Sequence, residues 1–452
     1  MALVFAPMKL KTNLCRFFKD HTRLDAIVND GTPEKRRKEY LAYHQVYVAN
    51  HDKAWADLEM LKEIVNQRRV LIIVDECQRL LTDGKKNRSR HALDEIIKSC
   101  KNPIVWTMSA SVVSATPLKY RDVFNLGGRR GNPLGSKSDF ENRYAASKRS
   151  VEIQTKNGGR FTATFFDWDL GALHEVRHRV SDLTQSVRKT DPGIRESFKG
   201  LQTIVVPVQM SPEDRKIYDI IVERAQEARL EGQTLAPYYR LLRYCCNTPE
   251  ALTKTTDEYG LGLSVAYPEL CTSRHSSKVE LLLEMLDGFK DSGEQVVCFI
   301  RETNLGLFLL ANQLAQRKIK HVLHYGVGQS DAASQQAQED FKSDPAVTVF
   351  LSSDSGALGL NLQSARYVVN YDVPYSYDLL MQRSNRIDRI DSHLDGLTSY
   401  VYVTEDSVEQ RIWDICNSRR ELAAATQGTS ETLSYGDEGL TQESLEHLIF
   451  GN

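Results

Sequence analysis

The chain has 452 residues, of which 41% are hydrophobic and 26% charged, and its formal net charge is -2. This length allows two or three domains with large cores. The near-neutral charge is unlike that of a protein that coats nucleic acid non-specifically, so any phosphate-binding surface has to be local.

Three other features argue against a membrane, secreted or zinc-binding protein. The longest apolar run is shorter than 18 residues, and the amino terminus lacks the basic and apolar regions of a signal peptide, so no membrane segment or secretion is expected. The eight cysteines form no C-x-x-C pair, which argues against a zinc site. A reducing cytoplasm is the expected compartment.

The first part of the chain alternates short apolar runs with helical patterns. The runs at residues 3–6, 46–49, 70–74 and 104–108 are strand candidates, and 70–74 is continuously aliphatic, as in a strand buried on both faces. This alternation predicts a doubly wound parallel sheet in an α/β fold. Residues 127–159 are rich in Gly, Arg, Ser and Asn and are expected to form a loop-rich insertion.

A second alternating block follows a segment that reads as a linker, with a strand at 204–208 and helices within 212–247. Strand candidates in this block are residues 295–300, 321–325, 347–353, 367–371 and 399–403. Helical patterns lie at 303–318, 330–342, 377–390 and 406–426. The block predicts a second parallel α/β lobe.

Two adjacent carboxylates, Asp75 and Glu76, follow the aliphatic run. Ligands of parallel sheets bind beyond the carboxyl ends of the strands. There Asp75 can hold Mg²⁺, and Glu76 can orient the water that attacks a γ-phosphate. The alternative is a pair of solvated acids that end a strand.

A cluster of polar residues near the end of the second block carries the next motif. Gln382, Arg386 and Arg389 are spaced i, i+4 and i+7, so they share one face if residues 377–390 form a helix. Two guanidinium groups on one face can bind a γ-phosphate and stabilise the charge of the transition state. The alternative is an exposed basic face, balanced by Asp388 and Asp391.

A turn rich in small residues, 351–362, follows another strand candidate. Its hydroxyl groups and glycines would let the backbone approach a phosphate or a nucleotide. The alternative is a tight strand-to-helix turn without a ligand.

The order and spacing of these motifs resemble those of the Swi/Snf-type ATPases of helicase superfamily two, over nearly the whole chain. Residues 2–7 with Lys9 and Asn13 resemble motif Ia, and residues 75–78 resemble motif II, a DEAH box with Cys for Ala and Gln for His. Residues 295–301, 351–362 and 382–390 resemble motifs IV, V and VI, with a departure at Asp391, where Gly is usual. Motif III is assigned to residues 109–111 in preference to the later Ser-Ala-Thr-Pro at 114–117.

The resemblance implies two RecA-like lobes at residues 1–195 and 273–427, a helical linker or insertion at 196–272 and a flexible tail at 428–452. It also implies hydrolysis of ATP with Mg²⁺ and translocation on DNA, double-stranded or forked, gripped through its backbone. The implied roles are catalysis for Asp75, Glu76, Gln382, Arg386 and Arg389, nucleotide binding for Gly359 and Asn361, and backbone contact for Lys9, Lys11, Asn13 and Ser353.

The phosphate-binding pattern G-x-x-x-x-G-K-[ST] does not occur in the 452 residues. In the family this Walker A segment precedes motif Ia. It is therefore expected to be lost, separately encoded or omitted by the choice of start, and an N-terminal fragment is expected to complete the first lobe. Without its strand, residues 71–74 are expected to expose unpaired backbone groups. The alternative function is a non-catalytic remnant that still binds nucleic acid.

Overall fold

The structure, a computed structural model, describes residues 1–8, 10–81, 87–109, 117–126, 131–154, 160–187, 189, 191–257, 260–273, 276–289, 292–357, 360–390, 392–427 and 442–451. Its contacts group into two compact units, one built mainly on Met1–Ser186 and the other mainly on Val187–Ser418. Within the described part, no helix has both the length and the apolar character needed to cross a membrane.

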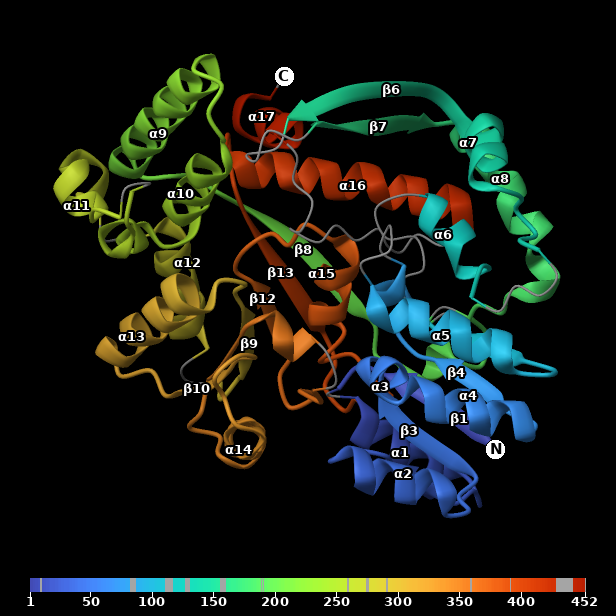
Figure 1. Ribbon diagram of the computed structural model, residues 1–452. Helices are drawn as coiled ribbons and strands as arrows, with labels where there is room; N and C mark the ends of the chain where they lie inside the picture. Colours follow the sequence, from blue (N-terminus) through green and yellow to red (C-terminus); the bar gives the residue numbers. More distant parts are fainter. Residues whose placement is uncertain are drawn as a thin grey trace. The chain divides into compact units, whose positions relative to one another are not determined.

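The first unit contains a parallel sheet whose five described strands follow the order β2-β3-β1-β4-β5 (Figure 1). These strands are β1 (Ala2–Ala6), β2 (Ala26–Val28), β3 (Val46–Asn50), β4 (Leu71–Val74) and β5 (Ile104–Thr107). The helices between them are α1 (Lys11–His21), α2 (Pro33–Leu41), α3 (His51–Ala56), α4 (Leu58–Gln67) and α5 (Arg88–Ser99). This is the doubly wound α/β arrangement expected from the sequence.

Helices cover the two faces of the first sheet unequally. One face, with Ile72 of β4, packs against α3, α4 and α5. The other face, with Ile73, packs against α1. Trp106 of β5 pairs in register with Ile73 and so lies on the α1 face, yet Trp106 is 58% exposed and Ile104 is 54% exposed.

The edge strands of the described first sheet are β2 and β5, and β4 is not an edge strand. β4 pairs with β1 on one side and with β5 on the other, so the expectation that residues 71–74 expose unpaired backbone groups is wrong. Among the described strands, none pairs with the outer side of β5. A cavity of about 780 Å³ runs along this edge, lined in part by Arg69, Val105 and Thr107.

The segment expected to be loop-rich contains regular structure. Here α7 (Lys137–Tyr144) begins at Ser136, which forms a reciprocal capping box with Asp139. α6 (Pro117–Val123) precedes it, and the hairpin of β6 (Ala145–Gln154) and β7 (Arg160–Trp168) and the helix α8 (Leu170–Arg179) follow. α6, α7 and α8 share a small hydrophobic core.

The second unit contains a parallel sheet whose six described strands follow the order β10-β11-β9-β12-β13-β8 (Figure 1). These strands are β8 (Leu201–Val208), β9 (Val296–Phe299), β10 (His321–His324), β11 (Val349–Ser352), β12 (Tyr367–Asn370) and β13 (Leu397–Thr404). The helices are α9 (Pro212–Leu230), α10 (Ala236–Asn247), α11 (Leu263–Ala266), α12 (Ser277–Gly288), α13 (Phe308–Gln316), α14 (Asp331–Ser343), α15 (Tyr377–Ser384), α16 (Val408–Gln427) and α17 (Gln442–Phe450).

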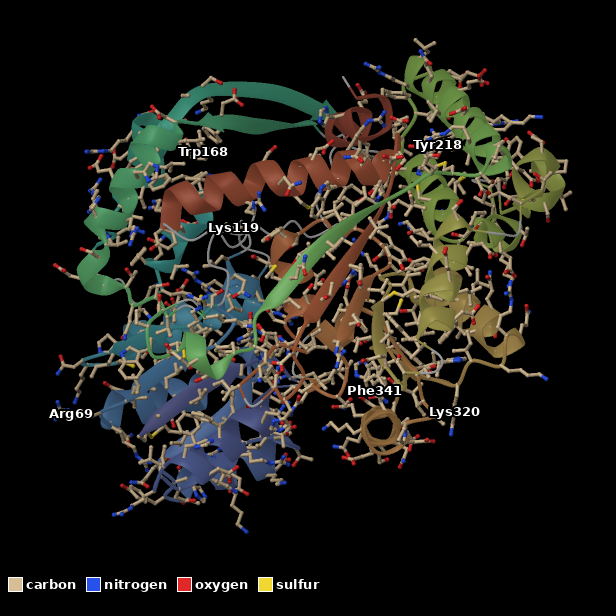
Figure 2. All side chains as sticks on the ribbon, turned by 180° about the vertical axis from the view of Figure 1, so that it is seen from behind. Arg69, Lys119, Trp168, Tyr218, Lys320 and Phe341 are labelled. Carbon is tan, nitrogen blue, oxygen red and sulfur yellow. The ribbon has the colours of Figure 1, made fainter. Side chains whose placement is uncertain are left out.

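Both faces of this sheet are covered. α12 and α13 pack on the face that carries Cys298, and α14 packs on the face that carries Val297. Phe341, labelled in Figure 2, belongs to α14. Its ring centroid lies 5.2 Å from that of Phe350 of β11. The second parallel lobe expected from the sequence is therefore present.

The segment expected to link the lobes supplies the edge strand of the second sheet. β8 pairs in parallel with β13, from Leu201 opposite Leu397 to Val208 opposite Thr404. α9 and α10 then pack into the hydrophobic core that includes Val401 and Val403 of β13. The pairing joins residues almost 200 positions apart, so a local pattern could not reveal it.

A buried ion pair joins elements of the second unit. Lys278 of α12 and Glu409 of α16 form a salt bridge, and both side chains are fully buried. Lys278 Nζ also donates hydrogen bonds to Asn247 Oδ1 at 2.8 Å and to the Tyr371 carbonyl at 2.9 Å. Glu409 Oε2 accepts a second hydrogen bond from Thr404 Oγ1 at 2.9 Å. The pair therefore ties α12 to α10, α16 and the end of β12.

Candidate functional site

The two carboxylates of motif II lie at the carboxyl end of β4, as the sequence predicts. The Asp75 amide donates to the Phe5 carbonyl at 2.8 Å, which continues the ladder between β4 and β1. Glu76 has a φ of 48°, in the left-handed region that non-glycine residues rarely adopt. Such strained residues concentrate at functional sites. The geometry turns the chain sharply directly after Asp75.

A chain of polar side chains connects motif II with the end of β5. Ser109 Oγ donates to Gln78 Oε1 at 2.6 Å, and Gln78 Nε2 donates to the Glu76 carboxylate. The Cys77 amide also donates to the Met108 carbonyl at 3.0 Å. Ser109 is thus the residue after β5 that reaches motif II. Residues 110 and 111 of the expected motif III, and residues 114–116 of its alternative, lie outside the described residues.

Burial and the neighbouring charge of Glu76 raise the pKa of Asp75 to about 6. Partial burial and the neighbouring carboxylate both disfavour the negative charge of Asp75. A cation bound beside the two carboxylates would offset both effects. Carboxylate oxygens are preferred ligands of Mg²⁺. Asp75 therefore fits the expected role of holding Mg²⁺, and the cation would supply positive charge next to the phosphates.

The raised pKa predicts a pH-dependent stability. The folded state holds the Asp75 proton more tightly than the unfolded state, so this contribution is present below pH 3.8 and is lost as the pH rises through about 6. Asp75→Asn should therefore stabilise the first unit at pH 7.5, by on the order of 1–2 kcal/mol, and give a smaller gain at pH 5.

The measurement is hydrogen exchange at β4 in the absence of divalent cations, at both pH values. Asp20→Asn, on the exposed side of α1, is the control and should give no pH-dependent gain. A gain for Asp75→Asn that is equal at the two pH values would contradict the assigned pKa.

The helix expected over 377–390 ends early. α15 ends at Ser384, with Asn385 as its C-cap, so Gln382 lies on the helix while Arg386 and Arg389 follow it. The shared helical face predicted for these three residues is therefore wrong. The chain leaves the helix because the Leu362 amide donates to the Arg386 carbonyl at 3.3 Å and Ile387 is buried beneath the second sheet.

Arg386 and Arg389 nevertheless stay near this helix end. Arg386 Nε donates to the Gln382 carbonyl at 2.8 Å, which fixes the direction of its guanidinium group. Arg389 is partly buried, and burial lowers the pKa of its guanidinium. No carboxylate of the described residues forms a salt bridge with Arg389, so its charge is available for an anion.

The turn after β11 is tightly packed. A Cβ on Gly356 would lie 2.0 Å from Ser352 Oγ, so only glycine fits there. Ser353 is only 6% exposed and bonds to Ser355 Oγ at 2.9 Å, which argues against direct contact of Ser353 with DNA. Asn361 is exposed, and Gly359 lies outside the described residues.

The expected backbone-contacting residues of the first unit surround the start of α1. Asn13 is exposed, whereas Lys11 pairs with Asp30 and its side chain is only 13% exposed. Lys9 lies outside the described residues. The charge of Lys11 is therefore already partly balanced within the fold.

Sequence reasoning missed a buried arginine next to motif VI. Arg383 is fully buried, and its Nε donates to Asp354 at 2.8 Å while its Nη1 donates to Asp372 at 3.1 Å. It joins the turn after β11 to the end of β12. An arginine one residue after Gln382 was visible in the sequence, but its two partners lie 29 and 11 positions away.

Comparisons with known proteins find similarity to helicases. The family model described as the helicase conserved C-terminal domain matches residues 277–391. The ATP-dependent helicase YqhH of Bacillus subtilis is 24% identical over 360 residues, which cover 76% of this chain and 57% of that protein. The helicase SWR1 of Candida glabrata is 27% identical over 311 residues, which cover 61% of this chain and 21% of that protein.

A solved structure of the SWI2/SNF2 ATPase core of Sulfolobus solfataricus in complex with double-stranded DNA aligns with a TM-score of 0.40 and 18% identity, covering 99% of this chain and 86% of that one. The chain spans less than two thirds of the length of the two relatives named above. The order of the motifs, the matched domain and the named relatives all support a helicase-like protein of superfamily two, of the Swi/Snf type.

Proposed function

We propose that this chain is the larger part of an ATP-driven DNA translocase. The observation that carries the proposal is the polar chain from Ser109 through Gln78 to Glu76, beside Asp75 at the carboxyl end of β4. In this role Asp75 holds Mg²⁺, and Glu76 accepts the proton of the attacking water. Gln78 fixes the direction in which the Glu76 carboxylate points.

The positive charge is proposed to come from two arginines. Arg386 and Arg389 neutralise the charge that develops on the transferred phosphoryl group, and Gln382 positions Arg386 through its carbonyl. Gly359 and Asn361 are proposed to approach the nucleotide from the turn after β11.

We further propose that a strand–loop–helix segment outside the 452 residues completes the first lobe and supplies the phosphate-binding loop. The support is the open edge of β5 together with the exposed Ile104 and Trp106 on the adjacent face. One added strand would pair with β5, and one added helix would cover the two side chains. An uncovered edge and apolar face of this kind favour association with another segment.

The test is DNA-stimulated ATP hydrolysis by the chain, with and without a strand–loop–helix segment taken from a full-length relative. The chain alone should remain at background. Addition of the segment should give hydrolysis that Glu76→Gln lowers by about 10²-fold or more. Robust hydrolysis by the chain alone would show that the phosphates are held in another way.

DNA binding through the backbone predicts a strong dependence on salt and little dependence on base sequence. Changing Lys9 and Lys11 to glutamate should weaken binding and reduce the slope of log affinity against log salt by at least about 1, with the smaller share from Lys11 because it already pairs with Asp30. Lys98→Glu, at an exposed position of α5, is the control and should leave the slope unchanged. A marked preference for one base sequence would contradict a backbone channel.

The second candidate is a non-catalytic remnant that binds nucleic acid, and the lack of a phosphate-binding pattern in the 452 residues favours it. It predicts DNA binding without hydrolysis even when the segment is supplied. The ATPase experiment therefore separates the two functions.

A further inference from the structure

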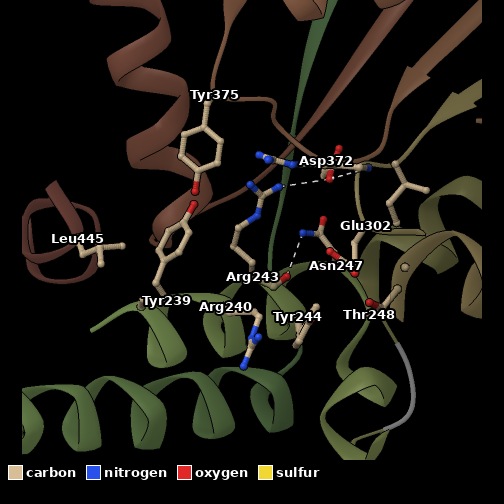
Figure 3. A pocket seen from close by; sticks show the side chains of 14 residues that line it. Tyr239, Arg240, Arg243, Tyr244, Asn247, Thr248, Glu302, Asp372, Tyr375 and Leu445 are labelled. Atoms are coloured by element: carbon tan, nitrogen blue, oxygen red, sulfur yellow. Dashed lines mark hydrogen bonds and ion pairs between the residues drawn. The ribbon is translucent and has the colours of Figure 1, made fainter. Parts of the chain in front are cut away.

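A cavity of about 320 Å³ lies in the second unit, between α10, the turn after β9 and the segment after β12 (Figure 3). Arg240 and Arg243 reach it from α10, and Arg301 reaches it from the end of β9. The hydroxyl groups of Tyr239 and Tyr375, which also line it, point toward one another (Figure 3). None of these residues belongs to the proposed hydrolysis site.

The lining of the cavity carries more positive than negative charge. Three arginines face two carboxylates, Glu302 and Asp372, of which Glu302 is exposed. Asp372 is already occupied, because Arg383 Nη1 donates to Oδ1 at 3.1 Å and the Arg301 amide donates to Oδ2 at 3.0 Å. Arg243 Nη2 adds a longer contact of 3.2 Å to the same Oδ2.

Arg243 can turn toward a ligand and still leave the Asp372 carboxylate with a positively charged partner. Burial alone would raise the pKa of Asp372, but Arg383 and Arg243 outweigh burial and hold this pKa below its ordinary value. If Arg243 moved to an anion, Arg383 would still face the buried carboxylate. Arg240 is exposed, and no carboxylate of the described residues forms a salt bridge with it.

Tyr375 gives an independent sign of a ligand. Two guanidinium groups lie near its ring, with Arg243 5.3 Å and Arg301 5.5 Å from the ring centroid. The residue is only 6% exposed, and its hydroxyl has no hydrogen-bond partner among the described residues. A buried hydroxyl without a partner costs about 1–3 kcal/mol, so an oxygen that bonds to it inside the cavity would be favoured.

We propose that this cavity is a second ligand site, which binds the phosphate of a ligand about the size of a nucleoside monophosphate. Guanidinium groups bind phosphate oxygens with two parallel hydrogen bonds, and Arg240 and Arg243 are placed to supply them. The Tyr375 hydroxyl bonds to a further oxygen of the ligand. The volume lies at the lower end of the range of small-molecule sites, which excludes a longer folded ligand.

The test is calorimetric titration of the complete chain with AMP and with adenosine. AMP should bind, and adenosine should bind at least about tenfold more weakly because the phosphate carries the recognition. Arg240→Gln and Tyr375→Phe should each weaken AMP binding by about tenfold. Arg317→Gln, an exposed arginine at the end of α13, is the matched control and should not change it.

The two variants are chosen because both should fold. Arg240 is exposed, and Tyr375→Phe removes only a hydroxyl that lacks a partner, so the temperature of unfolding should not fall. Equal binding of AMP and adenosine, or unchanged AMP binding by Tyr375→Phe, would overturn the proposal. Loss of AMP binding by Arg389→Ala but not by Arg240→Gln would place the ligand at the hydrolysis site and would also overturn it.

A second pair of titrations identifies the source of the phosphate. A DNA tetranucleotide with a 5′-phosphate is compared with the same tetranucleotide ending in a 5′-hydroxyl. Phosphate-dependent binding of the tetranucleotide would assign the cavity to a strand end, and binding of AMP alone would assign it to a free nucleotide. If neither phosphate-bearing probe binds, the proposal fails whether or not the chain hydrolyses ATP.

Discussion

Replacing Arg389 by alanine is expected to lower kcat of the completed motor by about 10³-fold or more and to change DNA affinity little. Arg389 is partly buried, burial lowers its pKa, and no carboxylate in the described part of the chain pairs with it. In the proposed mechanism this charge meets the phosphoryl group. The measurement is single-turnover hydrolysis of ATP with the strand–loop–helix segment and saturating DNA.

Replacing Arg386 by alanine, or even by lysine, should lower kcat in the same way. Its Nε is engaged with the Gln382 carbonyl, and only the planar fork of a guanidinium group can keep this bond and still donate to a phosphate. Arg317→Ala, at an exposed site, should keep full activity. Wild-type turnover by Arg386→Lys would remove Arg386 from the catalytic residues.

Replacing Lys278 by methionine is expected to lower the free energy of unfolding of the second unit by about 3–5 kcal/mol. The change leaves the fully buried Glu409 carboxylate without its cation, and also removes the donor to Asn247 and the Tyr371 carbonyl. Hydrogen exchange at β9 and β12 in increasing urea measures the loss. Replacing Glu409 by leucine in the same chain should recover part of it, because two apolar side chains need no charge compensation.

An exposed ion pair of the same unit is the control. Arg317 and Glu280 lie 4.0 Å apart and are both 56% exposed, so Glu280→Gln should change the free energy of unfolding by less than about 0.5 kcal/mol. A loss below about 1 kcal/mol for Lys278→Met would show that water or a rearranged neighbour compensates Glu409.

Local sequence patterns were sufficient to predict the class of fold and the positions of the main motifs. Runs of aliphatic residues such as those of β4 and β9 have a local cause, since a strand buried on both faces needs apolar side chains in both directions. The place of the two carboxylates after β4 could also be predicted, because the change from apolar to acidic residues at the end of a buried strand is visible in the sequence. The order and spacing of the motifs then gave the resemblance to Swi/Snf-type ATPases.

Which distant residues come into contact depends on long-range packing, which local patterns do not show. Two examples join positions far apart in the chain: the pairing of β8 with β13, and the buried ion pair of Lys278 and Glu409. The free energy of each contact depends on burial, which no local sequence pattern encodes. α15 ends at Ser384 although the sequence continues a helical spacing, because burial of Ile387 outweighs local helix preference. The strand β5, and not β4, is an edge strand of the first sheet because β4 pairs with β1 and β5, and strand order is set by the packing of whole elements.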